Sequence, residues 1–247
     1  MNVSWRVTEQ HNALMPPTYL SDVSAWHGHI PFAFWLTQVL KPECFVELGV
    51  HAGDSYMAWC QGLQDVGEPC NAIGIDTFEG DEHAGDYGAG MYQKVLAVHN
   101  PLYGEFSTVV EDSFENYANK MPDGQIDLLH IDGCHTYEAC DRDFRMWLPK
   151  MSSRGVMVLH DTQVTNVMGF GVFRKWDELN LLYPSFDFFH SSGLGMLLVG
   201  PDYNDLLSDM CAVNGKSEGQ WIREYFEVLA SRVHAQRNAR QGNGLPH

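Results

Sequence analysis

Short apolar runs alternate with amphipathic stretches along most of the chain. Five runs have the length and composition of buried strands, and they fall at 44–50, 71–77, 106–111, 126–132 and 156–160. The stretches with apolar residues at helical spacing are 55–63, 91–98, 137–148 and 170–182. Two more apolar runs, 186–190 and 196–199, flank a glycine-containing turn and form a predicted hairpin. This order predicts an α/β fold: a mostly parallel sheet with helices on both faces and an antiparallel edge.

The two ends of the chain extend this unit. An aromatic-rich stretch around 31–36 predicts a helix within the segment 16–40, and 219–240 predicts a last helix that packs on the domain or on a second copy of the chain. Residues 152–155 are expected to turn the chain into the fifth strand. We therefore expect an N-terminal helical extension (1–40), one α/β domain (41–200) and a C-terminal helical extension (201–247).

The net charge of the chain limits the classes of molecule that it is expected to bind. The 247 residues include 15 Lys and Arg against 32 Asp and Glu, a net charge of −17. A nucleic acid or an anionic membrane surface needs a basic face, so both are disfavoured. A neutral or cationic small molecule, or a metal ion, fits better, although the excess acid also serves solubility alone.

Two absences point to the cytosol. No apolar run approaches the roughly 20 residues that span a bilayer, and residues 1–15 lack the apolar core of a signal peptide. The six cysteines have neither CxxC pairing nor zinc-ligand spacing, so reduced structural thiols are expected. We expect a cytoplasmic protein without a membrane span.

Polar residues gather where the first strand is predicted to end, which is where ligands bind in parallel sheets. Glu47, Gly49, His51 and Gly53 lie in a turn of pattern E-x-G-x-x-x-G, which differs from the G-x-G-x-x-G of a dinucleotide site. An acid in place of a phosphate-binding helix terminus favours a cationic or phosphate-free nucleoside cofactor. A plain tight turn is the alternative.

The next two strand ends add to this reading. Asp76, at the end of the second strand, is placed to accept hydrogen bonds from ribose hydroxyls. Asp112 and Ser113 follow the third strand and suit an adenine edge, although a helix N-cap explains them equally well. Taken together, the three strand ends predict an adenosine cofactor.

The fourth and fifth strands end in a second cluster. Asp132 ends an apolar strand, where an unpaired carboxylate is costly, and His135 follows in the turn before the next helix. The neighbouring strand ends in His160 and Asp161. Asp132, His160 and Asp161 can together hold a divalent cation, with Mg²⁺ favoured by the oxygens and Mn²⁺, Fe²⁺ or Zn²⁺ by the histidine. Hydrogen-bonded helix caps are the alternative.

These motifs resemble a known family. FVELGVHAG, GIDTFEGDEHAGDYG, IDLLHIDGCHTYE and VMVLHDT, in this order, are similar to class I methyltransferases that use S-adenosylmethionine (SAM). The likeness runs from about residue 26 to 200 and is greatest to the subfamily found with sugar and polysaccharide biosynthesis. Macrolide-sugar and aminocoumarin-sugar O-methyltransferases are more distant relatives. The resemblance implies a Rossmann-like three-layer sandwich with a seven-stranded sheet.

The resemblance also implies a role for each candidate residue. Gly49 and Gly53 would line the methionine end of SAM beside Glu47 and His51, Asp76 would hold the ribose, and Asp112 with Ser113 would flank the adenine. Asp132 would contact the cofactor, orient the acceptor and bind Mg²⁺ with His160 and Asp161. The family has an acid where this chain has His160. His135 matches the position proposed as general base in relatives.

The expected reaction is methyl transfer to a hydroxyl of a sugar or glycan-related small molecule. A hydroxyl is a poor nucleophile, so His135 would act as base, with help from a metal. His83, in a loop, and His27 and His29, near the N-terminus, are candidates for contacts to the acceptor. Two alternatives stay open: a non-catalytic SAM-binding scaffold that partners a glycosyltransferase, and a methyltransferase acting on nitrogen or on a natural-product phenol.

Overall fold

Seven strands form the central sheet. The computed structural model describes residues 3–9, 11–23, 25–81, 85–88 and 90–242. The strand order is β5–β2–β1–β6–β7–β9–β8, and β9 runs antiparallel to the other six strands. The bounds are β1 (Cys44–Leu48), β2 (Asn71–Asp76), β5 (Ser107–Glu111), β6 (Ile126–Ile131), β7 (Met151–His160), β8 (Ser185–Phe188) and β9 (Leu194–Leu198). The predicted seven-stranded, mostly parallel sheet with a hairpin edge is confirmed.

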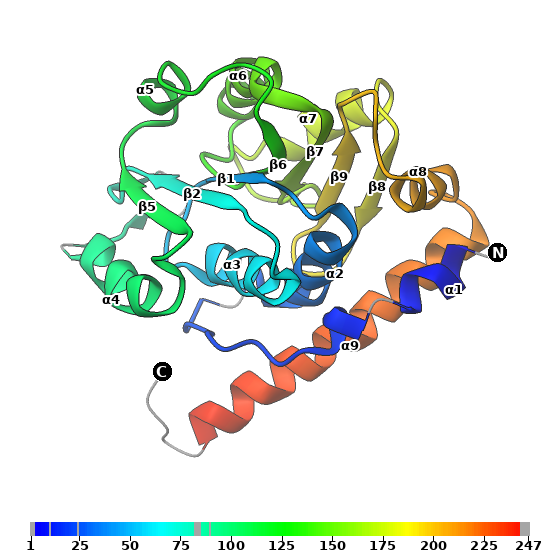
Figure 1. The fold of residues 1–247 in the computed structure, drawn as a ribbon, viewed down its shortest axis with the longest axis horizontal. Helices are drawn as coiled ribbons and strands as arrows, with labels where there is room; N and C mark the ends of the chain where they lie inside the picture. Colours follow the sequence, from blue (N-terminus) through cyan, green and yellow to red (C-terminus); the bar gives the residue numbers. More distant parts are fainter. Residues whose placement is uncertain (1–2, 10, 24, 82–84, 89, 243–247) are drawn as a thin grey trace.

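Helices cover both faces of this sheet (Figure 1). One face carries α5 (Phe114–Ala118), α6 (Tyr137–Trp147) and α7 (Val172–Asn180). The other carries α2 (Ile30–Leu40), α3 (Asp54–Val66) and α4 (Met91–Tyr103), with α1 (Val3–Thr8), α8 (Asp205–Ala212) and α9 (Ser217–Gly242) outside them. Single 3₁₀ turns lie at His11–Leu14, His27–His29 and Leu148–Lys150, and β3 (Gly80–Asp81) pairs with β4 (Gly85–Asp86) in a small hairpin. The three-layer arrangement agrees with the prediction.

Two apolar cores lie on opposite faces of the sheet, and they explain why the central strands read as continuous apolar runs. β1, β6 and β9 are buried at every position. α2 is buried over almost its whole surface because α3 and α9 both pack on it. A helix covered on several sides needs apolar residues all round, which is what its aromatic-rich sequence supplies.

The fifth strand begins earlier than predicted. We expected residues 152–155 to form a turn, but β7 starts at Met151, which pairs with Ile126. The next pair is Val156 with Leu128, so 152–155 bulge out of the strand without ending it. The carbonyl of Gly155 accepts the amides of Val199 and Gly200, which holds the bulge against the end of β9.

Several helices have no counterpart in the predicted pattern. α1, α5 and α8 have five to eight residues, too few to show a clear helical period. α4 continues through Pro101 to Tyr103, beyond the expected end at 98. No helix among the described residues is long and apolar enough to cross a membrane.

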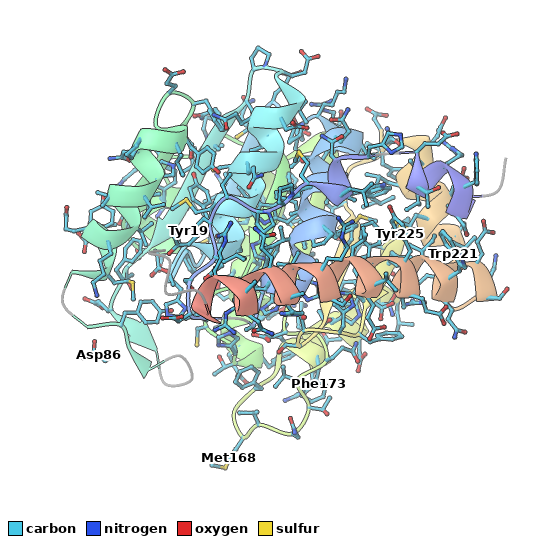
Figure 2. The ribbon with its side chains drawn as sticks, turned by 90° about the horizontal axis from the view of Figure 1, so that it is seen from below. Tyr19, Asp86, Met168, Phe173, Trp221 and Tyr225 are labelled. Carbon is cyan, nitrogen blue, oxygen red and sulfur yellow. The ribbon has the colours of Figure 1, made fainter. Side chains whose placement is uncertain are left out.

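The two ends of the chain lie against each other. Figure 2 shows Tyr19, in the N-terminal segment, beside the C-terminal part of α9, with Trp221 and Tyr225 towards the start of that helix. Arg240 donates to the carbonyls of Pro17 and Thr18, and Arg237 donates to that of Asp22. The last helix therefore fixes the path of residues 17–22, which lead into the candidate site.

Candidate active site

A cavity of about 180 Å³ lies at the carboxyl ends of β1, β6 and β7. Three segments line it: the N-terminal segment, the turn after β1 with Tyr87, and the ends of β6 and β7. The lining residues are Val23, Ala25, Trp26, Gly49, Val50, His51, Ala52, Asp54, Ser55, Tyr87, Asp132, His135, His160 and Asp161. Predicted residues from the first, fourth and fifth strands thus meet at one place.

The turn after β1 reaches this cavity because of its glycines. Gly49 has φ +93°, and a Cβ there would lie 2.0 Å from the carbonyl oxygen of Asp132. Gly53 has φ +90° and precedes α3 directly. Only glycine combines this conformation with such a close approach, so the turn can pass beside the end of β6.

Glu47 lies beneath the cavity, fully buried. It accepts a hydrogen bond from Ser55 at 2.9 Å and faces Nδ1 of His130 at 2.8 Å. The indole N–H of Trp26 can only donate, and it points at Nε2 of His130 at 3.2 Å, so Nδ1 is the nitrogen of His130 that donates to Glu47. Burial raises the pKa of Glu47, against the opposing effect of His130 and Ser55. Glu47 therefore supports the turn from below and does not line the cavity.

Asp76 holds the same turn from the side. Its carboxylate accepts the backbone amides of Val50 and His51, both at 2.8 Å, and that of Phe78 at 2.7 Å. Asp76 is 6% exposed and is not among the residues that line the cavity. His51, which does line it, stacks on Tyr87 with ring centroids 4.2 Å apart.

Asp112 and Ser113 lie further away, where β5 leads into α5. Ser113 is the N-cap of that helix and accepts the amide of Asn116 at 3.2 Å. Asp112 binds Lys120 at 2.7 Å, and this hydrogen bond lowers the pKa of Asp112. Neither residue lines the cavity, so the geometry found here is the helix-capping alternative for Ser113.

Two carboxylates and two imidazoles form the cluster at the ends of β6 and β7. Nδ1 of His160 lies 3.1 Å from Oδ1 of Asp132 and 3.5 Å from Oδ2 of Asp161. Nε2 of His160 lies 3.1 Å from the carbonyl of Ser191, which can only accept, so this nitrogen carries a proton. Nε2 of His135 lies 2.9 Å from Oδ2 of Asp161.

The charges in this cluster support one another. Burial favours neutral His160, but the facing carboxylates of Asp132 and Asp161 outweigh it and hold the pKa of His160 well above the usual range. Burial likewise disfavours the ionised carboxylates, yet His160 keeps the pKa values of Asp132 and Asp161 low. The carboxylates of Asp132 and Asp161 and the imidazole of His160 therefore stabilise one another's charged forms.

A metal ion has suitable donors here. Among the described residues, the donor atoms of Asp132, His135 and Asp161 lie within 4.8 Å of one another. The expected set was Asp132, His160 and Asp161, and Nδ1 of His160 also faces both carboxylates. Two carboxylates with one imidazole suit Mn²⁺, Fe²⁺ or Zn²⁺ as well as Mg²⁺. The donor chemistry thus fits a divalent cation with either histidine.

The N-terminal segment supplies one wall of the cavity, through Val23, Ala25 and Trp26, where the residues expected from the sequence were His27 and His29. Asp54, in the first turn of α3, accepts from the backbone amide and the hydroxyl of Ser21 and lies 2.7 Å from Nε2 of His27. Trp26 lines the cavity between these contacts and His130. No sequence signal marks Asp54, because an acid at the start of a helix is ordinary.

Three other histidines were candidates for contacts to the acceptor, and the structure describes two of them. His27 and His29 are fully buried and do not line the cavity. Nε2 of His29 lies 3.0 Å from the carbonyl of Ser191, the same oxygen that His160 faces. His83 lies outside the described residues.

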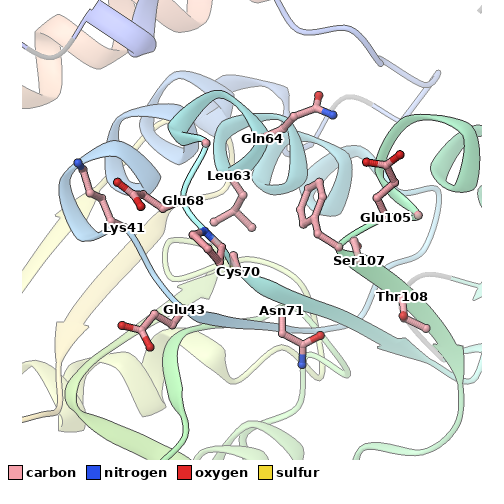
Figure 3. A pocket seen from close by; sticks show the side chains of 14 residues that line it. Lys41, Glu43, Leu63, Gln64, Glu68, Cys70, Asn71, Glu105, Ser107 and Thr108 are labelled. Carbon is pink, nitrogen blue, oxygen red and sulfur yellow. The ribbon is translucent and has the colours of Figure 1, made fainter.

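A larger hollow of about 1200 Å³ lies at the opposite edge of the sheet (Figure 3). It borders the amino ends of β1, β2 and β5, where Glu43, Asn71 and Ser107 stand. None of the predicted site residues lies there. Since ligands of parallel sheets bind at the carboxyl ends, the smaller cavity is the candidate active site.

The chain is similar to methyltransferases. Residues 46–162 match a family model described as methyltransferase domain. A protein of Sinorhizobium fredii, named uncharacterized protein y4gI, is 38% identical over 234 residues, which cover 92% of this chain and 25% of that protein. The chain thus spans a quarter of the length of this relative.

Solved structures share the fold. A methyltransferase of Podospora anserina bound to S-adenosylhomocysteine (SAH) has TM-score 0.53 and 13% identity, covering 80% of this chain and 88% of that one. The O-methyltransferase TomG of Streptomyces achromogenes, in complex with SAM, has TM-score 0.52 and 12% identity, covering 81% and 90%. The chain therefore shares the fold of these solved methyltransferases, and its residues 46–162 match the methyltransferase domain model.

Proposed function

We propose that the chain transfers a methyl group from SAM to a hydroxyl of a small molecule, with a sugar or glycan as the acceptor. The observation that carries this proposal is the convergence of His135, Asp161 and Asp132 beside the glycine turn after β1. A proton acceptor and a close backbone turn at one cavity are what hydroxyl methylation by a bound nucleoside cofactor requires.

The cofactor would lie along the turn after β1. Gly49 and Gly53, both at positive φ, give the turn the path along which the methionine end would lie, and the stacked rings of His51 and Tyr87 form one wall. Asp76 would act by holding the turn through the amides of Val50 and His51, with its remaining lone pairs directed to the ribose. Glu47 would act only through the turn above it. Asp112 and Ser113 stay candidates for the adenine end.

His135 would take the proton from the acceptor hydroxyl. Asp161 faces its Nε2 and would orient the ring and stabilise the imidazolium that forms. The acceptor would lie towards Trp26 and Val23, the wall opposite the turn. Methyl transfer in line with the sulfonium then depends on how well this wall aligns the hydroxyl.

A divalent cation fits the same cluster. Asp132, Asp161 and His160 would hold it, which leaves His135 to act as base. When bound, such an ion lowers the pKa of a coordinated hydroxyl. The chain's own part is to hold the two carboxylates in place through His160, whose Nε2 is fixed by the Ser191 carbonyl.

Calorimetric titration tests the cofactor. The purified, chelator-treated chain is titrated with SAH, then again after addition of Mg²⁺ or Mn²⁺. We expect micromolar binding of SAH, and a separate titration with the metal alone shows whether the cluster binds it. Asp161→Asn should weaken metal binding, whereas Asp177→Asn, an exposed acid on α7, should not. Absence of SAH binding in every condition rules out the proposed reaction.

The acceptor atom is tested separately. Nitrogen acceptors need less help from a base, so their methylation should survive loss of His135, while hydroxyl methylation should not. A chain that binds SAH but methylates no acceptor would favour a scaffold role beside a glycosyltransferase.

A further inference from the structure

We propose that the acceptor is uncharged or cationic around the methylated hydroxyl, so that methylation acts on a sugar after it has left its phosphate or nucleotide carrier. This inference rests on the proposed function and specifies the substrate class of the same site. It follows from the distribution of charge around the cavity.

The lining of the cavity, in the part of the chain that the structure describes, includes carboxylates but neither Lys nor Arg. Among the described residues that line it, Asp54, Asp132 and Asp161 are acids. Residues 42–93 contain ten Asp or Glu and no Lys or Arg, and this stretch includes β1, its turn, β2 and the loop with Tyr87. A phosphate in this cavity would therefore meet negative charge without a compensating cation.

Basic side chains on the elements around the cavity have partners of their own. Arg237 of α9 donates to the carbonyl of Asp22, next to Val23. Arg174 lies over the ring of Tyr137 at 4.6 Å, and Lys175 binds Asp141 at 2.6 Å. Of the three histidines that line the cavity, His160 faces Asp132 and His135 faces Asp161, whereas His51 stacks on Tyr87. A divalent cation held by the two Asp side chains would only balance them, so it adds no surplus positive charge.

In the turn after β1, as far as the structure describes it, backbone amides that could bind a phosphate are already bound within the chain. Phosphates bind where a turn presents free amides at a helix N-terminus. Here the amides of Val50 and His51 are bound by Asp76, and that of Gly53 donates to the carbonyl of Val50. Asp54 adds a carboxylate to the first turn of α3. The usual anion site of such a turn is thus filled by the chain's own acids.

The negative charge around the cavity indicates whether the sugar is methylated before or after glycosyl transfer. A nucleotide-activated sugar carries a diphosphate on its anomeric oxygen, and a sugar phosphate carries a single phosphate group. Neither matches the cavity, whereas a finished glycoside or an amino sugar does. The class of reaction that supplies the substrate is therefore a glycosyl transfer, in which the sugar–phosphate bond breaks and the new glycosidic bond forms before methylation.

The test compares acceptors that differ only in charge. Methyl glycosides of common hexoses are each paired with the corresponding sugar 1-phosphate, and transfer of labelled methyl from SAM is measured with the full chain. We expect kcat/KM to be at least about tenfold higher for the methyl glycoside of any pair that is turned over. Equal or faster turnover of the phosphorylated partner overturns the proposal.

A substitution that adds a cation at the rim of the cavity tests whether charge selects the acceptor. Val23 lines the cavity and is 40% exposed, so Val23→Lys can be accommodated. We expect it to reduce the discrimination against sugar phosphates several-fold, whereas Val23→Gln, of similar length and uncharged, leaves it unchanged. Unchanged discrimination in Val23→Lys would show that charge is not what selects the acceptor.

A binding measurement decides the case where no sugar is methylated. The SAH-bound chain is titrated with pyrophosphate. Saturable binding that Val23→Asp weakens places an anion in the cavity and overturns the inference; no binding, or binding that this variant does not affect, agrees with it. Failure of the proposed function is recognised separately, by absence of SAH binding or of any methyl transfer.

Discussion

Nε2 of His27 lies 2.7 Å from Oδ1 of Asp54, and both side chains are buried. The same carboxylate accepts the backbone amide of Ser21 at 2.8 Å. These contacts join the N-terminal segment to the first turn of α3, directly after the glycine turn. The wall that contains Trp26 therefore depends on one side chain of α3.

Asp54→Asn should loosen this wall. The loss of one charge-assisted contact is expected to lower the free energy of unfolding by about 1.5–3 kcal/mol. Amides in 21–27 should exchange with solvent faster, because the segment loses an anchor that α9 does not replace. Hydrogen exchange read by mass spectrometry measures this, with Asp177→Asn as the exposed control. Unchanged exchange in 21–27 would mean that α9 alone holds the segment.

Asp76→Asn should weaken cofactor binding through the turn. An amide side chain has one accepting oxygen in place of two, so at least one of the amides of Val50, His51 and Phe78 loses its partner. We expect SAH affinity to fall by about 1–3 kcal/mol. Glu111→Gln is the matched control, because Glu111 pairs with Asp76 across the sheet and is exposed. Equal SAH affinity in wild type and Asp76→Asn would show that the turn does not bind the cofactor.

The sequence predicts the strands and their polar ends because both depend on local pattern. Asp132 and Asp161 each follow an apolar run, and parallel strands bring their carboxyl ends together. The contacts that anchor the N-terminal segment cannot be predicted from local pattern. Ser21 and Asp54 are 33 positions apart and Pro17 and Arg240 are 223 apart, so no local pattern reports them.

The bulge in β7 was missed for a similar reason. Ser152 and Gly155 are turn-forming residues, and only pairing with β6 and β9 keeps them in the strand. The positions of Glu47 and Asp76 also depend on contacts between elements, since both acids serve the turn after β1 from neighbouring sites.

His135→Ala should remove hydroxyl methylation and spare the cofactor. Loss of a general base lowers kcat by about 10²–10⁴-fold. SAH affinity should stay within about twofold, because the ring faces Asp161 and Phe170 rather than the glycine turn. Single-turnover kinetics with saturating SAM measure the first effect and calorimetry the second. His11→Ala, in an exposed 3₁₀ turn, is the control; a fully active His135→Ala chain removes the general-base assignment.

Ionisation of the Asp143 carboxyl should make the free energy of unfolding depend on pH. Burial raises its pKa to about 6, and Arg142 at 3.5 Å only partly opposes this. Because the pKa in the folded state exceeds the unfolded value, the stabilisation is fully present below about pH 4 and is lost as the pH rises through about 6. Asp143→Asn cannot ionise, so it should become more stable relative to wild type as the pH rises, by up to about 3 kcal/mol between pH 4 and 7.5.

Urea unfolding of wild type and Asp143→Asn across this range measures the difference. The exposed Asp177→Asn is measured alongside as the control for the loss of a surface carboxylate. A difference between Asp143→Asn and wild type that stays constant with pH would mean that the pKa of Asp143 is the same in the folded and the unfolded chain. The contact with Arg142 would then be strong enough to compensate burial, although Arg142 is largely exposed and Asp143 is not.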